Sequence, residues 1–163
     1  MAKRNKRTKK VSQSARPSEG KQVRQSENPE SSDRETVAWR ISDFDWQGPW
    51  GDKALKDANL PDLVREWASN FEKQTWFELM SASGGKTLGT NHHRIEIEKL
   101  SKLAKDRLTA LKKDDLDSVF SFRISSRARV YGIKDRRAFC ALWYDPWHGD
   151  QKKAVCASKK RHT

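Results

Sequence analysis

The chain has 163 residues, of which 34 are Lys or Arg and 22 are Asp or Glu, so its formal net charge is +12. This excess favours an anionic partner such as nucleic acid, a ribosome or an anionic membrane surface, although a basic surface that only keeps the protein soluble is the alternative. No apolar run is long enough to span a bilayer and none follows the basic N-terminus, so we expect no membrane span, no secretory signal peptide and a cytoplasmic protein. The two cysteines form no Cys-x-x-Cys pair and predict no disulfide framework.

The first segment, residues 1–36, contains few hydrophobic side chains and is rich in Lys, Arg, Ser, Gln and Glu. A chain of this composition cannot bury enough apolar surface to offset the entropy cost of ordering, so we predict a disordered basic tail. Six of its first ten residues are Lys or Arg, and this block could bind phosphates without sequence preference. A solvated tail without a dedicated partner is the alternative. We expect residues 37–163 to form a single domain.

An aromatic-rich arm, residues 37–58, opens this domain. Its large apolar side chains fall within a dozen residues and include Trp39, Phe44, Trp46 and Trp50. We predict an extended arm whose rings pack on the domain, because exposing this many rings would favour aggregation. Two alternatives are that RNA bases stack on these rings and that the arm marks a groove for a partner protein.

Two helices are predicted to follow the arm, over residues 60–80 and 95–111. Asn59 can cap the first helix and Pro61 suits its first turn, and apolar side chains recur at helical spacing along both segments. Between them, residues 84–87 (GGKT) resemble a phosphate-binding loop. They lack its first glycine and a preceding strand, so we predict that no nucleotide cofactor binds there.

Two adjacent histidines, His92 and His93, precede the second helix. Neighbouring residues on a helix cannot share one face to chelate a metal, and no cysteine or carboxylate cluster accompanies them, so we predict no metal site and no cofactor. These residues either form the start of the helix, with Asn91 near the cap, or place a histidine where it contacts or protonates a phosphate.

Three short strands are predicted over residues 119–125, 127–133 and 137–144, with a hairpin turn at 134–136. Side chains alternate across a strand, and one parity of the first two strands is apolar. The opposite parity carries Arg123, Arg127, Arg129 and Tyr131. The third strand is apolar on both parities, as expected at the centre of a sheet. A last short strand could form at 154–157.

These elements predict an α+β fold in which the two helices pack on one face of a small, mainly antiparallel sheet and the cationic parity forms the other face. Arginines on such a face can hold phosphates through paired hydrogen bonds and stabilise the charge of a phosphoryl transition state. His148, which follows the third strand after Pro146, could serve as acid or base near neutral pH. A solvated face, with arginine chosen for solubility, is the alternative. Near the C-terminus, Lys160, Arg161 and His162 could add contacts to nucleic-acid phosphates.

The run FSFRIS…RARVYGIKDRRAFCALW, with the Leu-rich segment before it, resembles the RelE/ParE-type toxin family over residues 95–148, about a third of the chain. The resemblance implies a RelE-like fold. For RelE-like members it also implies a small RNase that cuts messenger RNA without a metal, usually in the ribosomal A site, by attack of the substrate's own 2′-hydroxyl. ParE-like members instead poison DNA gyrase. The resemblance gives catalytic roles to Arg123, Arg129 and Tyr131, and His148 is added by its position after the last strand. The N-terminal half and the Asp145-Pro146-Trp147 strand exit depart from the family's pattern.

The leading hypothesis is therefore a toxin-like endoribonuclease whose partners are RNA or the ribosome, and an antitoxin protein. The alternative is a non-catalytic RNA- or ribosome-binding module, in which Arg127, His92 and His93 hold phosphates together with the basic C-terminal residues. All four histidines of the chain compete for the acid–base role, and their spacing alone does not choose between them.

Overall fold

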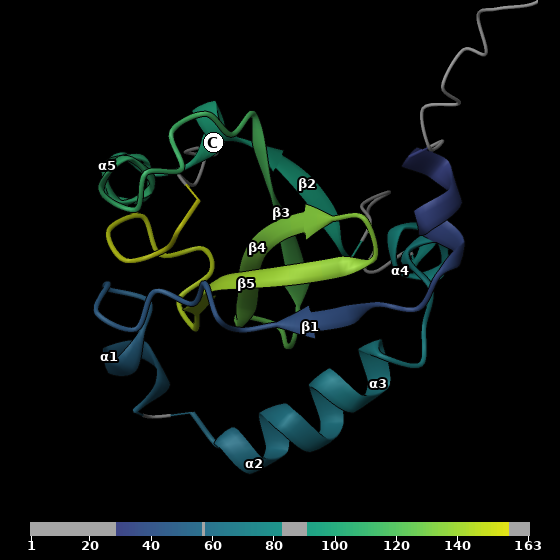
Figure 1. Cartoon of the computed structure of the whole chain (residues 1–163). Helices are drawn as coiled ribbons and strands as arrows, with labels where there is room; N and C mark the ends of the chain where they lie inside the picture. The colour runs from purple at the N-terminus through teal and green to yellow at the C-terminus, as the bar shows by residue number, and fades with distance from the viewer. Residues whose placement is uncertain (1–28, 57, 83–90, 157–163) are drawn as a thin grey trace, which may run out of the picture.

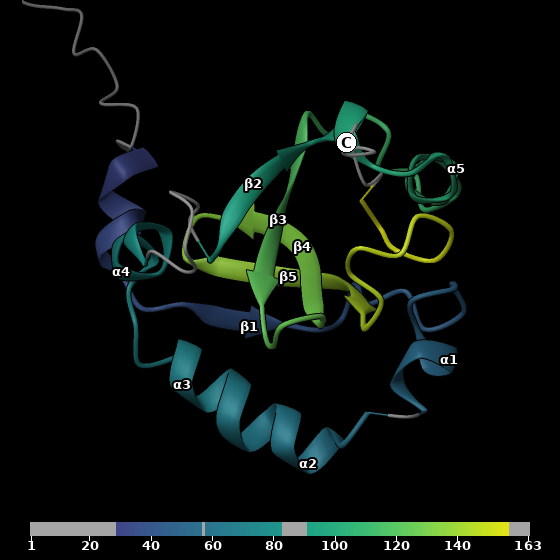
Figure 2. The same cartoon turned by 180° about the vertical axis from the view of Figure 1, so that it is seen from behind.

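The computed structural model describes residues 29–56, 58–82 and 91–156 (Figures 1 and 2). The fold is α+β, with one five-stranded sheet and several short helices. The strands are β1 (Ala38–Arg40), β2 (His93–Glu96), β3 (Ser118–Arg123), β4 (Arg129–Asp135) and β5 (Ala138–Asp145). Their order in the sheet is β1-β5-β4-β3-β2, with β1 parallel to β5 and all other pairs antiparallel. The predicted α+β class and the mainly antiparallel sheet are confirmed.

The three predicted strands form the β3–β4–β5 meander, each within two residues of its expected bounds. Strands β4 and β5 meet in a two-residue turn, Arg136-Arg137, because Asp135 pairs with Ala138. Arg136 enters the turn with φ of 52°, so the hairpin closes slightly later than the predicted turn at 134–136. Strand β5 is buried from Phe139 to its end, as expected of a strand with a neighbour on each side and side chains packed on both faces.

Both faces of the sheet carry an apolar layer. On one face, Phe120, Phe122 and Phe139 pack with Trp76 and Leu79 of α4 (Trp76–Ser81). The rings of Phe122 and Phe139 lie edge to face with their centroids 4.5 Å apart, an arrangement that aromatic pairs prefer.

The opposite face is covered by α5 (Lys102–Ala110). Leu108 of α5 packs there with Val119, Tyr131 and Trp143 of the strands. Figures 1 and 2 show α5 well apart from the α2–α3 segment. The prediction that the helices share one face is therefore wrong, because the second parity of the strands also carries large apolar side chains and needs its own cover.

The segment predicted as one helix over 60–80 is interrupted. It contains α2 (Leu60–Asp62), the π-helical stretch η2 (Leu63–Ala68) and α3 (Ser69–Phe71), and then α4 begins after Thr75. Thr75 and Glu78 form a capping box, in which the N–H of Thr75 donates to Glu78 Oε2 at 2.7 Å and the N–H of Glu78 donates to Thr75 Oγ1 at 3.2 Å. This reciprocal pair satisfies two N–H groups of a new helix start and makes the break stable.

The segment predicted as a helix over 95–111 is helical only in its second part. Its first residues lie in β2, where Ile95 pairs with Val119 of β3, and a 3-10 turn, η3 (Ile97–Lys99), follows. Helix α5 begins after Ser101, whose side-chain oxygen accepts the N–H of Ala104 at 3.3 Å. The predicted last strand at 154–157 is reduced to one bridge between Leu100 and Cys156.

The described part of the chain begins with η1 (Pro29–Arg34). Lys134 of β4 forms an ion pair with Asp33 at 2.7 Å, and Val37 is buried. The prediction of disorder is therefore wrong for residues 32–36, and residues 1–28 lie outside the described part.

The aromatic arm packs on the domain as predicted for most of its rings. Trp50 is fully buried and its Nε1 donates to the Lys153 carbonyl at 2.8 Å, while the ring of Trp39 lies edge-on to Phe139. Trp46 is the exception, because about half of it is exposed. The short helix α1 (Asp52–Leu55) completes the arm. Within the described ranges, no helix is long and apolar enough to cross a bilayer.

Candidate functional site

Two of the predicted arginines face each other at one end of the sheet. Arg123 ends β3, Arg129 begins β4, and the two are direct partners in the antiparallel ladder. The guanidinium of Arg123 is half-buried, and it donates from Nη1 to Asn91 Oδ1 at 3.1 Å and from Nε to the Ser125 carbonyl at 3.3 Å. Its charge is therefore held in place while part of the side chain stays open to solvent.

Arg129 is buried more deeply, with 8% of its surface exposed. Its Nη1 donates to the carbonyl oxygens of Ser125 and Ala128 at 2.7 and 2.9 Å. These contacts close the turn between β3 and β4, so Arg129 has a structural role in addition to its charge. Burial lowers the pKa of Arg129 from its usual value. Because the pKa of an arginine lies so far above 7, the guanidinium still stays charged at neutral pH.

Three histidines gather around these arginines. The buried ring of His92 accepts the backbone N–H of Arg123 on Nδ1 at 3.1 Å and lies edge-on to Phe71. Burial, together with the charges of Arg129, His93 and Arg123, lowers the pKa of His92 to about 4. We call Arg123, Arg129, His92, His93 and His148 the cationic cluster.

His148, a member of the cationic cluster, lies in the turn that follows β5. Burial lowers its pKa, and the charges of Arg129, His93 and Arg123 act in the same direction. Its backbone N–H donates to the Arg127 carbonyl at 3.1 Å, which ties the turn to the β3–β4 connection. Nδ1 of His148 is buried and has no hydrogen-bond partner among the described residues. The ring is therefore neutral at pH 7 and able to accept a proton.

A buried carboxylate that the sequence analysis overlooked shapes this turn. Asp145 pairs with Arg129 across the ladder and is fully buried. Its Oδ1 accepts the N–H of Trp147 at 2.8 Å and its Oδ2 accepts the N–H of Val155 at 2.9 Å. Burial raises the pKa of Asp145, although these two bonds and Arg129 oppose that rise. An aspartate directly before Pro146 was the available signal, because Asp side chains commonly bind the backbone two residues on.

Two clefts flank the β3–β4 connection. The larger, about 570 Å³, lies between Arg123 and Ser125 on one side and Asn70 and Gln74 on the other. The smaller, about 400 Å³, is lined by Arg127, Pro146, Trp147, His148, Gly149 and Asp150. The half-exposed guanidinium of Arg123 and the ring of His148 therefore each border an open space.

Tyr131 is not among the residues that line these two clefts. It is fully buried among the side chains under α5, and its hydroxyl donates to Cys156 Sγ at 3.4 Å. Burial, and then Cys156, raise the pKa of Tyr131 well above its usual value. The prediction of one open cationic sheet face is therefore wrong, because α5 and residues 154–156 cover that face. Only its end, between Arg123 and Arg129, reaches the clefts.

The remaining predicted contacts divide into two groups. Arg127 is exposed in the β3–β4 connection and His93 is exposed on β2, so both can meet a partner. Lys160, Arg161 and His162 lie outside the described residues. In the part of the chain that the structure describes, no group of three or more His, Cys, Asp and Glu side chains is placed to hold a metal ion.

Acid should destabilise the fold through His92. Its pKa is about 4 in the folded protein and 6.5 when exposed, so the unfolded chain takes up this proton first and stability falls as the pH drops from 6.5 towards 4. We expect His92 to contribute about 2 kcal/mol to the loss of unfolding free energy between pH 7 and 4.5.

Urea unfolding of the wild type and of His92→Gln at both pH values measures this contribution. The variant should be less stable at pH 7 and should lose less stability at pH 4.5 than the wild type does. Equal losses in the two proteins would show that His92 is protonated equally easily in both states.

Comparisons of the chain with protein-family models, with curated proteins and with solved structures gave no significant match. The likeness to the RelE/ParE-type toxins therefore rests on the sequence motif alone and stays a prediction.

Proposed function

We propose that this protein is a toxin-like endoribonuclease that acts on messenger RNA in the cytoplasm without a metal ion. The observation that carries the proposal is the cationic cluster, in which two arginines lie near a neutral histidine, His148, and in which Arg123 and His148 each border an open cleft. The resemblance of residues 95–148 to the RelE/ParE-type family supports the same substrate and the same reaction.

In the proposed reaction the 2′-hydroxyl of one nucleotide attacks its own 3′-phosphate. His148 accepts the proton of that hydroxyl, a bond forms between O2′ and phosphorus, and the bond to the 5′-oxygen of the next nucleotide breaks. The leaving 5′-oxygen takes a proton from water, and His148 later returns its proton to the solvent. The products are a 2′,3′-cyclic phosphate and a 5′-hydroxyl. Arg123 binds the phosphate oxygens, and the charges of Arg123 and Arg129 stabilise the extra negative charge of the transition state.

The lowered pKa of His148 predicts the pH profile. A general base must be unprotonated, and kcat/KM reports the pKa of the free enzyme. We expect kcat/KM for RNA cleavage to rise about tenfold per pH unit in acid and to level off below pH 6.5, because burial and the neighbouring cations lower this pKa. Initial rates between pH 4.5 and 8 measure it, and a plateau reached only above pH 7 would contradict the assignment of His148.

A non-catalytic RNA- or ribosome-binding module is the second candidate. It is favoured by the burial of Tyr131 and His92, which leaves fewer groups free for proton transfer than the resemblance implies. Such a module would bind RNA with an affinity that falls steeply with salt and would leave the RNA intact.

An antitoxin protein is the second proposed partner. We place its binding site in an apolar groove of about 180 Å³ between the aromatic arm and the start of the α2–η2 segment. Large apolar side chains line this groove and are at least 48% exposed, namely Ile41, Trp46, Leu60 and Val64. Exposed apolar side chains gathered in this way are typical of surfaces that bind a partner protein.

Expression in bacteria with a growth readout tests the proposal. Wild-type protein should arrest growth and fragment messenger RNA, and His148→Ala should relieve both effects while its thermal transition stays within a few degrees of the wild type. Arg65→Ala is a matched control, since Arg65 lies on the α2–η2 segment with a largely exposed side chain. Loss of activity only in variants that unfold would count against the proposal.

A further inference from the structure

The smaller cleft beside His148 has a chemical character of its own. It lies between Arg127 of the β3–β4 connection and the turn that contains Trp147, His148 and Asp150. Its lining therefore combines an indole ring, a guanidinium, an imidazole and a carboxylate. The proposed reaction uses only the histidine.

The carboxylate of Asp150 is charged at neutral pH. Its Oδ1 accepts the backbone N–H groups of Lys152 and Lys153 at 2.8 and 3.1 Å, and these bonds hold the pKa of Asp150 below its usual value. A fixed negative charge repels phosphate and attracts hydrogen-bond donors. The Asp150 side of the smaller cleft is therefore poorly suited to a phosphate, whereas Arg127 on its other side can hold one.

The indole ring of Trp147 is held in place. Its backbone N–H is bound by Asp145, and its side chain packs against the apolar layers on both faces of the sheet. Lys153 Nζ lies 5.8 Å from the ring centroid, which shows that a cation can approach one face of the ring. A rigid aromatic ring beside exposed cations is the usual platform for an unpaired nucleobase.

We infer that this cleft binds one unpaired base of the substrate RNA, with the base stacked on Trp147 and its N–H donors directed to Asp150. The inference rests on the proposed function and adds its substrate class, which is single-stranded RNA with a preference at one position. Adenine, cytosine and guanine each carry an exocyclic amino group. Uracil offers only its ring N3–H, which lies between two carbonyl oxygens that a carboxylate repels. The base beside the cut should therefore be one of the first three.

Binding of short 2′-O-methyl RNA oligomers tests the inference, because these oligomers lack the attacking hydroxyl and stay intact. At low salt, wild-type protein should bind oligo(A) and oligo(C) several-fold tighter than oligo(U), and about tenfold tighter than an abasic oligomer of equal length. Asp150→Asn should abolish the preference over oligo(U), while Asn can still accept the two backbone N–H groups. Asp52→Asn, an exposed carboxylate on α1, is the control and should keep the preference.

Trp147→Leu should abolish the preference for bases over the abasic oligomer, and Trp147→Phe should keep part of it with less disturbance of the core. Equal affinity of wild-type protein for the base-bearing and abasic oligomers, or an unchanged base order in Asp150→Asn, would overturn the base site while leaving RNA cleavage by the cationic cluster intact. Failure of wild-type protein to bind any oligomer would overturn both proposals.

Discussion

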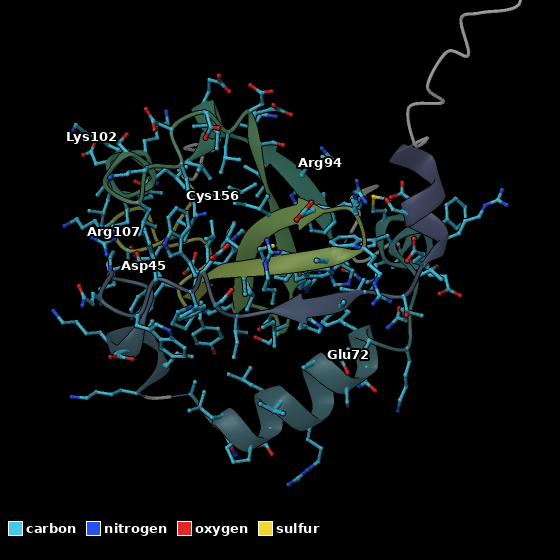
Figure 3. All side chains as sticks on the ribbon, viewed as in Figure 1. Asp45, Glu72, Arg94, Lys102, Arg107 and Cys156 are labelled. Carbon is cyan, nitrogen blue, oxygen red and sulfur yellow. The ribbon has the colours of Figure 1, made fainter. Side chains whose placement is uncertain are left out.

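Asp45→Ala should lower the free energy of unfolding by about 3 kcal/mol. Asp45 is 4% exposed and lies in the aromatic arm, and Arg107 of α5 points towards it (Figure 3). Its carboxylate accepts Arg107 Nε at 2.6 Å and Nη2 at 2.5 Å, and Nε1 of the buried Trp143 at 3.1 Å. Removing it leaves a guanidinium and a buried indole N–H without their acceptor, and it removes the side-chain bonds that join Asp45 to α5 and to Trp143 of β5.

The same ion pair should weaken in acid. Burial alone would raise the pKa of Asp45, but the bonds from Arg107 and Trp143 hold it below its usual value of 3.8. Its contribution is therefore complete above pH 4 and is lost as the pH falls through the lowered pKa. Urea unfolding at pH 7 measures the effect of the substitution. Asp43→Ala is the control, because Asp43 is more exposed and its nearest cation lies 3.9 Å away. A loss below 1 kcal/mol for Asp45→Ala would show that the arm is held mainly by its rings.

Arg123→Ala should lower the rate of RNA cleavage by about 10²–10³-fold with little loss of stability. The side chain is half-buried, bonds to Asn91 and the Ser125 carbonyl and lines the larger cleft, so its charge is available to a phosphate there. Arg123→Lys should recover part of the rate, since lysine keeps the charge without the paired hydrogen bonds. Single-turnover cleavage together with thermal unfolding separates the two effects.

Arg129→Ala is the useful contrast to this variant. Because Arg129 closes the β3–β4 turn through two carbonyl oxygens, its loss should lower both activity and stability. A rate for Arg123→Ala within threefold of the wild type would remove Arg123 from the proposed site.

Strand pairing is what made part of the candidate site predictable. Alternation along the strands placed Arg123 and Arg129 on one parity, and the antiparallel ladder then makes them direct partners. The same alternation misplaced Tyr131, because parity says which side chains share a face and not what covers that face. The cover comes from α5 and Val155, which are distant in sequence.

The helix errors have a similar origin. Ile97 and Leu100 fit a helical spacing, and the predicted helix begins at Ile95. Ile95 lies in a strand instead, because β3 offers an unpaired edge to β2. A long-range pairing of this kind overrides local propensity. The sequence contains signals for the observed helix starts, namely the capping box from Thr75 to Glu78 and the capping side chain of Ser101. The prediction relied on the apolar spacing instead.

The choice among the histidines needed three-dimensional structure. His92 is buried against Phe71 and Phe122 with Nδ1 bound to the backbone, while His148 borders a cleft. Both lie in the same cationic surroundings. Their different exposure, which no spacing in the sequence reports, decides which one is available to a substrate.

Incubation of purified protein, treated with EDTA and then desalted, with messenger RNA and ribosomes tests the central proposal most directly. The wild type should produce fragments that end in a 2′,3′-cyclic phosphate. A substrate with 2′-deoxyribose at the cut position should stay intact, and His148→Ala should cut at least a hundredfold more slowly. RNA that stays intact with wild-type protein, or cleavage at an equal rate by His148→Ala, would contradict a ribonuclease that works through the cationic cluster.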